Sequence, residues 1–164
     1  MIRHATAITV FTVTAGTAAI AEDLVSWGGS GGWAILIDKV VGNGCLMEKH
    51  FEDGTHVQIG AVPNRDGGFF AAYNPAWTDI EDGAVGTVKF DFPDIVFSGE
   101  VVSVAKDGLY GGYAFFDNPN VPMEFAARNS MTIIGTRGRT IEITLEGTAK
   151  AIQAVEACQA EQPK

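Results

Sequence analysis

The chain has few basic residues and only two cysteines. Lys and Arg together number 11 against 20 Asp and Glu, and the formal net charge is −9. A surface with this balance repels phosphate backbones and anionic lipid headgroups, so nucleic acid is not expected as a partner. Beyond residue 21 no stretch is long and apolar enough to span a bilayer, and we expect no stable membrane insertion of the processed chain.

The usual signatures of nucleophilic catalysis and phosphate binding are missing. Ser98, Ser103 and Ser130 do not lie in a G-x-S-x-G elbow. The Gly-rich stretch 28–32 follows no expected strand and carries no Lys, so it is not a phosphate-binding loop. The sequence therefore predicts no cofactor, although 20 acidic residues leave carboxylate-based sugar hydrolysis open.

The acidic run 79–83 does not match a known calcium loop. Counted from Asp79, the fifth position is Gly83 and the twelfth is Phe90, where an EF-hand requires a ligand side chain and a bidentate Glu. We interpret the run as a polar turn after Trp77. An irregular calcium site that includes Asp91 or Asp94 is the alternative.

The first 21 residues have the features of a cleavable secretory signal peptide. Arg3 provides the positive charge, an uncharged stretch follows from Ala5 to Ala19, and Ala19-Ile20-Ala21 has the small-x-small cleavage pattern. We expect cleavage after Ala21 and export to the periplasm or beyond the cell. The remaining chain is expected to contain a flexible Gly-rich leader (22–32), a single β-rich domain (33–160) and a frayed tail (161–164).

The two cysteines are expected to form one disulfide. Cys45 and Cys158 both belong to the part of the chain delivered to an oxidising compartment. Their bridge would tie an early strand to the last helix. A reactive thiol or redox pair is the alternative, but the chain has no C-x-x-C arrangement to support it.

The central part of the chain has the pattern of an antiparallel β-sheet. Asn-Gly, Asp-Gly and Arg-Gly turn signals recur at short intervals between runs of β-branched and aromatic residues. The expected fold class is α+β, mainly β: an antiparallel meander forming a sandwich or a partly open barrel. The expected strands are 33–41, 45–51, 55–62, 69–73, 85–92, 95–105, 131–136 and 139–145.

Two segments have helical patterns. Pro122 suits the first turn of a short helix over 121–129, with Met123, Phe125 and Ala126 on its apolar side. A second helix is expected over 148–160, with Thr148 as its N-cap. Its apolar stripe is Ala151, Ile152, Val155 and Cys158.

The hairpin from Cys45 to Ala61 contains a candidate metal site. If Glu52-Asp53-Gly54 is a three-residue loop with Gly54 in the left-handed position, His50 faces His56 across the hairpin. Both would then lie on the outer face beside Glu48, close enough to share a divalent metal. A solvated polar face is the alternative.

Four aromatic residues are candidates for a binding surface. They are Trp77, Tyr73, Tyr110 and Tyr113, which lie in or beside two Gly-flanked aromatic clusters. An exposed aromatic patch on a sheet favours a protein partner or a small ligand. The alternative is that these rings fill the core.

The overall layout resembles a group of small exported proteins of Gram-negative bacteria, mostly uncharacterised. The resemblance depends on the segments 33–38 and 74–77, on Cys45 opening a hairpin, and on 145–151 leading to Cys158. The element Leu-x-Gly-Thr-x-x-Ala at 145–151 is also similar to invasion-associated locus B proteins. The resemblance implies a disulfide-linked exported domain and transfers no catalytic residue.

The sequence favours a non-enzymatic envelope domain that binds a partner protein or a small ligand through its sheet. The first alternative is a hydrolase or metal-dependent enzyme that uses surface carboxylates with His50 and His56. The second is a purely structural envelope protein. A concave pocket with convergent polar groups would favour the enzyme, and a shallow apolar patch would favour the binding domain.

Overall fold

The computed structural model describes residues 23–63, 67–106 and 108–163, and within them one antiparallel sheet carries two helices. The expected signal peptide lies outside the described residues. The elements in chain order are β1 (Leu24–Ser30), β2 (Trp33–Asp38), β3 (Gly44–His50), β4 (His56–Ala61), β5 (Gly68–Tyr73), β6 (Val85–Phe92), β7 (Ile95–Lys106), β8 (Leu109–Phe116), α1 (Asn120–Ala127), β9 (Ser130–Ile134), β10 (Thr140–Thr144) and α2 (Thr148–Ala160).

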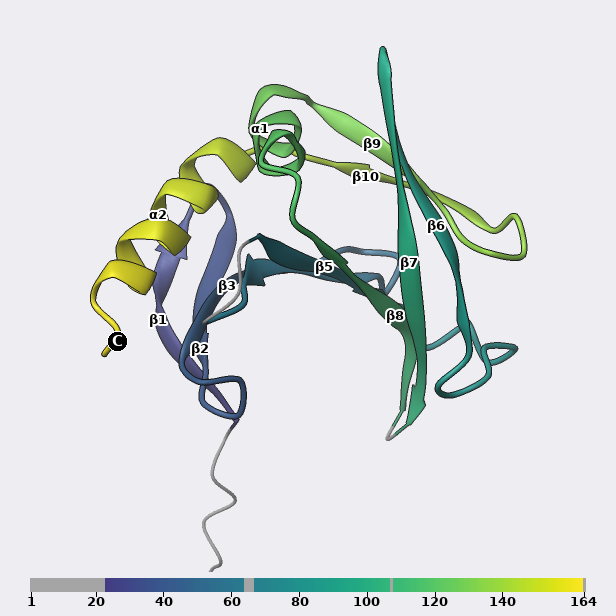
Figure 1. Ribbon diagram of the computed structural model, residues 1–164, viewed down its shortest axis with the longest axis horizontal. Helices are drawn as coiled ribbons and strands as arrows, with labels where there is room; N and C mark the ends of the chain where they lie inside the picture. Colours follow the sequence, from purple (N-terminus) through teal and green to yellow (C-terminus); the bar gives the residue numbers. More distant parts are fainter. Residues whose placement is uncertain (1–22, 64–66, 107, 164) are drawn as a thin grey trace, which may run out of the picture.

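The strands form a single ten-stranded sheet in the order β1-β2-β3-β4-β5-β8-β7-β6-β9-β10. Figure 1 shows that the sheet curves into an open arch, with α1 and α2 near the gap between its two ends. The expected class, α+β and mainly β, is confirmed, and a partly open barrel describes it better than a two-sheet sandwich. Strand β8 was not among the expected strands, and it joins β5 to β7 at the centre of the sheet.

The prediction of a flexible leader over 22–32 is wrong, because this segment contains β1. Strand β1 pairs with β2 along its whole length, with one irregularity at Trp27. Gly31 and Gly32 have φ of 61° and 82°, as a two-residue hairpin turn of type I′ requires at both central positions. The indole N–H of Trp27 also donates to Oε2 of Glu161 at 2.9 Å, so β1 is attached to the end of α2.

The core lies on the concave side of the sheet. Helix α1 inserts Phe125, which is fully buried, between Phe70, Phe90 and Phe92, with ring centroids 5.6 to 6.3 Å apart. The predicted apolar side of this helix was partly wrong, because Met123 is 58% exposed and Val121 is buried instead. The reason is that Val121 and Phe125 are four residues apart and therefore lie on one face.

Helix α2 covers the concave side of the first strands of the sheet and has the predicted buried stripe. Ala151, Val155 and Cys158 are buried, and the disulfide between Cys158 and Cys45 on β3 is present with a Cα–Cα distance of 6.0 Å. Thr148 is not the N-cap. Gly147 takes that position. The Thr148 hydroxyl instead donates hydrogen bonds to the carbonyl oxygens of Leu145 and Phe125.

The end of α2 is held by backbone hydrogen bonds. The N–H groups of Glu161 and Gln162, which were expected in a frayed tail, donate to the carbonyls of Cys158 and Gln159. In the described part of the chain, neither helix has the length and apolar character needed to cross a membrane.

Candidate functional site

The half of the concave face that α2 does not cover contains a cavity of about 300 Å³. Its walls come from β5 to β10 and from the connection between β5 and β6. Phe70 and Phe90 line the cavity and also contact the ring of Phe125. The cavity is therefore directly adjacent to the apolar core. A volume of this size is at the lower end of the range of small-molecule sites.

The cavity exists because small residues occupy the inner positions of the central strands. Side chains alternate between the two faces along a strand, and the inner positions of β5, β8 and β7 at this level are Ala72, Gly112, Ala114 and Ser103. Larger aliphatic residues such as Val88 and Ile133 form the opposite wall. The lining is therefore mostly apolar, and the sheet supplies few polar groups.

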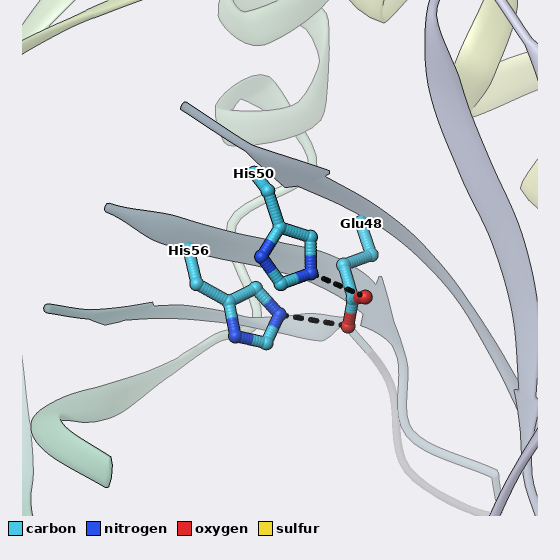
Figure 2. Close-up of side chains that lie close together, drawn as sticks. All are labelled: Glu48, His50 and His56. Atoms are coloured by element: carbon cyan, nitrogen blue, oxygen red, sulfur yellow. Dashed lines mark hydrogen bonds and ion pairs between the residues drawn. The ribbon is translucent and has the colours of Figure 1, made fainter. Parts of the chain in front are cut away.

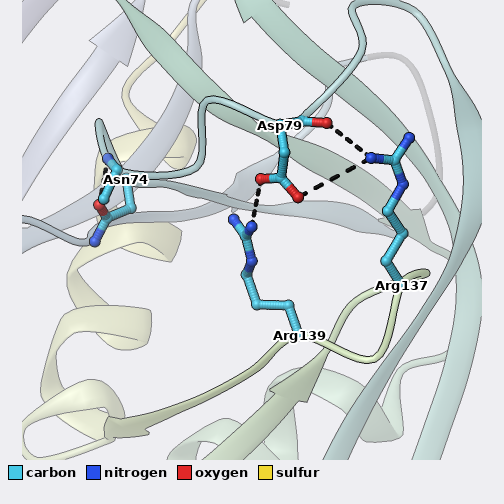
Figure 3. A network of polar contacts seen from close by, with 5 residues as sticks. Asn74, Asp79, Arg137 and Arg139 are labelled. Carbon is cyan, nitrogen blue, oxygen red and sulfur yellow. Dashed lines mark hydrogen bonds and ion pairs between the residues drawn. The ribbon is translucent and has the colours of Figure 1, made fainter.

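The polar residues of the cavity gather where it opens to solvent. Asp79 comes from the β5–β6 connection, and Arg137 and Arg139 come from the β9–β10 hairpin, as Figure 3 shows. The side chains of Asp79 and Arg137 are 54% and 66% exposed, whereas Phe70 and Phe90 are buried. Asp79 pairs with Arg139, and Nη1 of Arg137 donates to the Asp79 carbonyl oxygen at 2.9 Å.

The arginines set the electrostatics of this opening. The hydrogen bond from Arg139 and the charges of both arginines hold the pKa of Asp79 below its usual value. The Arg139 guanidinium also lies 5.5 Å from the centroid of the Trp77 ring, which is a cation–π distance. Nη1 of Arg139 is buried and has no hydrogen-bond partner among the described residues. An unpaired buried donor is costly, and an acceptor on a ligand would satisfy it.

The acidic run 79–83 is a turn, as the sequence predicted. Asp79 is paired with arginine, and the Asp82 carboxylate accepts a hydrogen bond from the backbone N–H of Ala105 at 2.9 Å. These carboxylates support the loop at the cavity opening and do not converge on one point.

The candidate metal site is assembled on the opposite, convex face. His50 faces His56 in the register of β3 and β4, as predicted, and Gly54 has the positive φ of 83° that the three-residue loop requires. The two imidazole rings stack with centroids 4.2 Å apart. Figure 2 shows both rings directed at Glu48, whose carboxylate oxygens lie 3.1 Å from Nε2 of His50 and 2.8 Å from Nε2 of His56.

Glu48 is held in its ionised form. Burial of the carboxylate raises its pKa, but contacts with His56, Gln58 and His50 outweigh burial and lower the pKa of Glu48 to about 2. Nε2 of Gln58 donates to the carboxylate at 2.7 Å. Nε2 of His56 is near enough for an ion pair but lacks hydrogen-bond geometry, and it has no hydrogen-bond partner within the described ranges.

The four candidate aromatic residues do not form one surface. Trp77 lines the cavity, whereas the pairing of Tyr73 with His56 places it on the convex face beside the histidines. Tyr113 is on the convex face with Phe115, at a centroid distance of 5.4 Å. Tyr110 lines a small hollow of about 200 Å³ next to the histidines.

Sequence reasoning missed the cavity and its two arginines. The lining is spread over six strands and two connections, so no local motif reports it. One signal was present: small residues recur at alternate positions in the central strands, at Ala72, Gly112 and Ala114, where a filled core would have large side chains.

Searches of protein-family models, of curated proteins and of solved structures each found no match for this chain.

Proposed function

We propose that this chain is an exported binding protein that takes a small, largely apolar molecule with one anionic group into the cavity on its concave face. The observation that carries the proposal is the combination of buried apolar walls with an arginine pair at the opening. Apolar pockets with a few well-placed polar groups are the usual form of small-molecule sites.

The apolar part of the ligand would pack against Phe70, Phe90 and Ile133. Each methylene removed from water contributes about 0.8 kcal/mol, so a chain of several carbons gains most of its affinity there. The anionic group would accept hydrogen bonds from Arg139, whose buried Nη1 has no partner among the described atoms. Arg137, mostly exposed, would add attraction at the entrance.

The compartment is the second part of the proposal. The disulfide between Cys45 and Cys158 fits an oxidising environment, and the signal peptide pattern at 1–21 supports export to the periplasm or beyond the cell. The resemblance to small exported proteins of Gram-negative bacteria supports the same location. The location stays a prediction. The similarity to invasion-associated locus B proteins also stays a prediction.

A hydrolase has less support than a binding protein. Glu48, His50 and His56 lie on the convex face and therefore do not face the cavity. At the cavity opening Asp79 has a lowered pKa, is paired with arginine and would be a weak base.

Calorimetric titration with 1-decanesulfonate tests the proposal, with 1-decanol as the uncharged comparison. We expect saturable binding with one site per chain, and weaker binding of decanol because it lacks the charge that Arg139 would bind. Ser103→Leu fills the cavity and should weaken binding at least tenfold. Ser98→Leu is the matched control, because Ser98 lies on the other face of the same strand and is exposed.

Two results would overturn the proposal. One is the absence of saturable binding of either probe to the folded, disulfide-bonded protein. The other is equal affinity of the Ser103→Leu and Ser98→Leu variants, which would place bound probe elsewhere on the surface.

A further inference from the structure

We propose that Glu48, His50 and His56 form a divalent transition-metal site, with Zn²⁺ as the ion that the donor set fits best. The site is on the convex face of the β3–β4 hairpin and is independent of the cavity. One carboxylate and two imidazoles are ordinary zinc ligands, and their donor atoms all lie within 4.8 Å of one another.

The distances between the donors are close to those of a loaded site. Ligands 2.0 to 2.1 Å from a tetrahedral ion lie about 3.3 Å apart. The contact from Oε1 of Glu48 to His50, 3.1 Å, and the contact from Oε2 to His56, 2.8 Å, are slightly shorter than this, and all three donors lie within 4.8 Å of one another. The stacked rings would have to tilt apart for both Nε2 lone pairs to reach one ion, whereas the paired backbone of the hairpin would not have to move.

One of the three donors is held in place before any ion arrives. Gln58 donates to Glu48 at 2.7 Å and fixes the carboxylate, beside which the two rings stack. Partners of this kind orient metal ligands and raise affinity. The Glu48 carboxylate would therefore lose little conformational entropy when it binds an ion.

An independent observation points to a missing ligand. Nε2 of His56 is buried and has no hydrogen-bond partner among the described residues, although Oε2 of Glu48 is 2.8 Å away. The nitrogen and the carboxylate oxygen form a close ion pair that is poorly directed for a hydrogen bond. An ion between them would accept the lone pairs of both.

Three protein ligands leave at least one coordination position open. His50 and His56 also line the hollow of about 200 Å³ together with Tyr73 and Tyr110, so water or a small anion has room beside the ion. Sites with three protein ligands and an open position exchange ligands readily, whereas structural zinc sites are closed by four. We therefore infer a reversible zinc site on an exposed hairpin.

Calorimetric titration of the chelator-treated, disulfide-bonded protein with ZnCl₂ tests this site. We expect one ion per chain with a dissociation constant below about 100 μM, as three ligands on one hairpin would give. His56→Asn and Glu48→Gln should each weaken binding by about tenfold or more. Glu100→Gln is the matched control and should leave the affinity unchanged, since Glu100 is an exposed carboxylate on β7, which β5 and β8 separate from the β3–β4 hairpin.

Nitrogen-15 NMR of the imidazole rings keeps the test independent of variant folding. Zinc should shift the Nε2 resonances of His50 and His56 in the unmodified protein. Binding weaker than 1 mM, unshifted ring nitrogens, or unchanged zinc affinity in the double variant His50→Asn, His56→Asn would each overturn the proposal. In those cases the cluster is a pair of histidines stabilised by Glu48 alone.

Discussion

Cys158, near the end of α2, is covalently bonded to Cys45 at the start of β3, and the two residues are 113 positions apart in the sequence. The bond fixes α2 over the concave side of the sheet. The backbone N–H of Cys45 also donates to the side chain of Gln159 at 2.8 Å, so a hydrogen bond reinforces the same junction.

Loss of this disulfide should lower the free energy of unfolding by up to about 5 kcal/mol, because closing a loop of this length removes entropy from the unfolded chain. Urea unfolding of the protein with and without reductant measures the loss. A variant with both cysteines replaced by serine should match the reduced protein and ignore the reductant. Equal stability of the oxidised and reduced protein would contradict the prediction.

Phe125→Ala should lower the free energy of unfolding by about 3–5 kcal/mol, since it leaves a void among Phe70, Phe90 and Phe92. Met123→Ala on the same helix is the control, and it should cost less than about 0.5 kcal/mol because its side chain is 58% exposed. Chemical unfolding monitored by circular dichroism compares them. Similar losses in both variants would contradict the prediction that core packing decides the effect, since alanine favours a helix at both positions.

Gly31→Ala should be more harmful than Gly83→Ala, although both glycines have positive φ. A Cβ at Gly31 would lie 2.2 Å from the carbonyl oxygen of Gly147, whereas a Cβ at Gly83 would meet no atom within 4 Å. We expect a loss of about 1–2 kcal/mol at Gly83 from backbone strain alone and about 2–5 kcal/mol at Gly31, where a clash adds to it. Thermal unfolding of the two variants gives the comparison, and equal losses would mean that β1 moves freely away from α2.

Asp79→Asn should raise the affinity for decanesulfonate severalfold, because the Asp79 carboxylate competes with an anionic ligand for Arg139. Since the pKa of Asp79 is lowered, this carboxylate stays ionised from pH 7 down to pH 5, and binding to the unmodified protein should not change over that range. Asp94→Asn is the control, as Asp94 pairs with Arg128 instead. Weaker binding by Asp79→Asn would mean that Asp79 mainly positions the arginines.

Glu48 should contribute a pH-dependent part of the stability in metal-free protein. The folded pKa of about 2 lies below the ordinary value of 4.5, so this contribution is complete above about pH 4.5 and is lost as the pH falls toward 2. The contacts with His56 and Gln58 supply most of this effect and the His50 side chain is 69% exposed, so we expect only about 1–2 kcal/mol. Urea unfolding should show Glu48→Gln less stable at pH 6, with a difference that shrinks steadily as the pH falls from 4.5 toward 2. If the two proteins differed in stability by the same amount at every pH in that range, the charge of Glu48 would not be the cause of the difference.

Local patterns predicted much of the sheet and both helices. Strand β6 has the expected limits, and the β3–β4 hairpin has the expected register, because a left-handed Gly54 leaves one way to put Met47 and Val57 inside. Local patterns failed at β1. The Gly-rich sequence has weak strand propensity, and its pairing with β2 and its contacts with α2 override that preference.

The sequence by itself determined the features that depend on neighbouring residues: the turns, the alternation of faces, the opposition of His50 and His56, and the direction of Cys158. Only the tertiary structure decided the strand order and the curvature that places β5 beside β8 and brings Asp79 to Arg139, 60 residues away. The physical reason is that a cavity is the space left between distant segments. Its volume depends on how the whole sheet curves around small residues such as Gly112, and no local pattern carries that information.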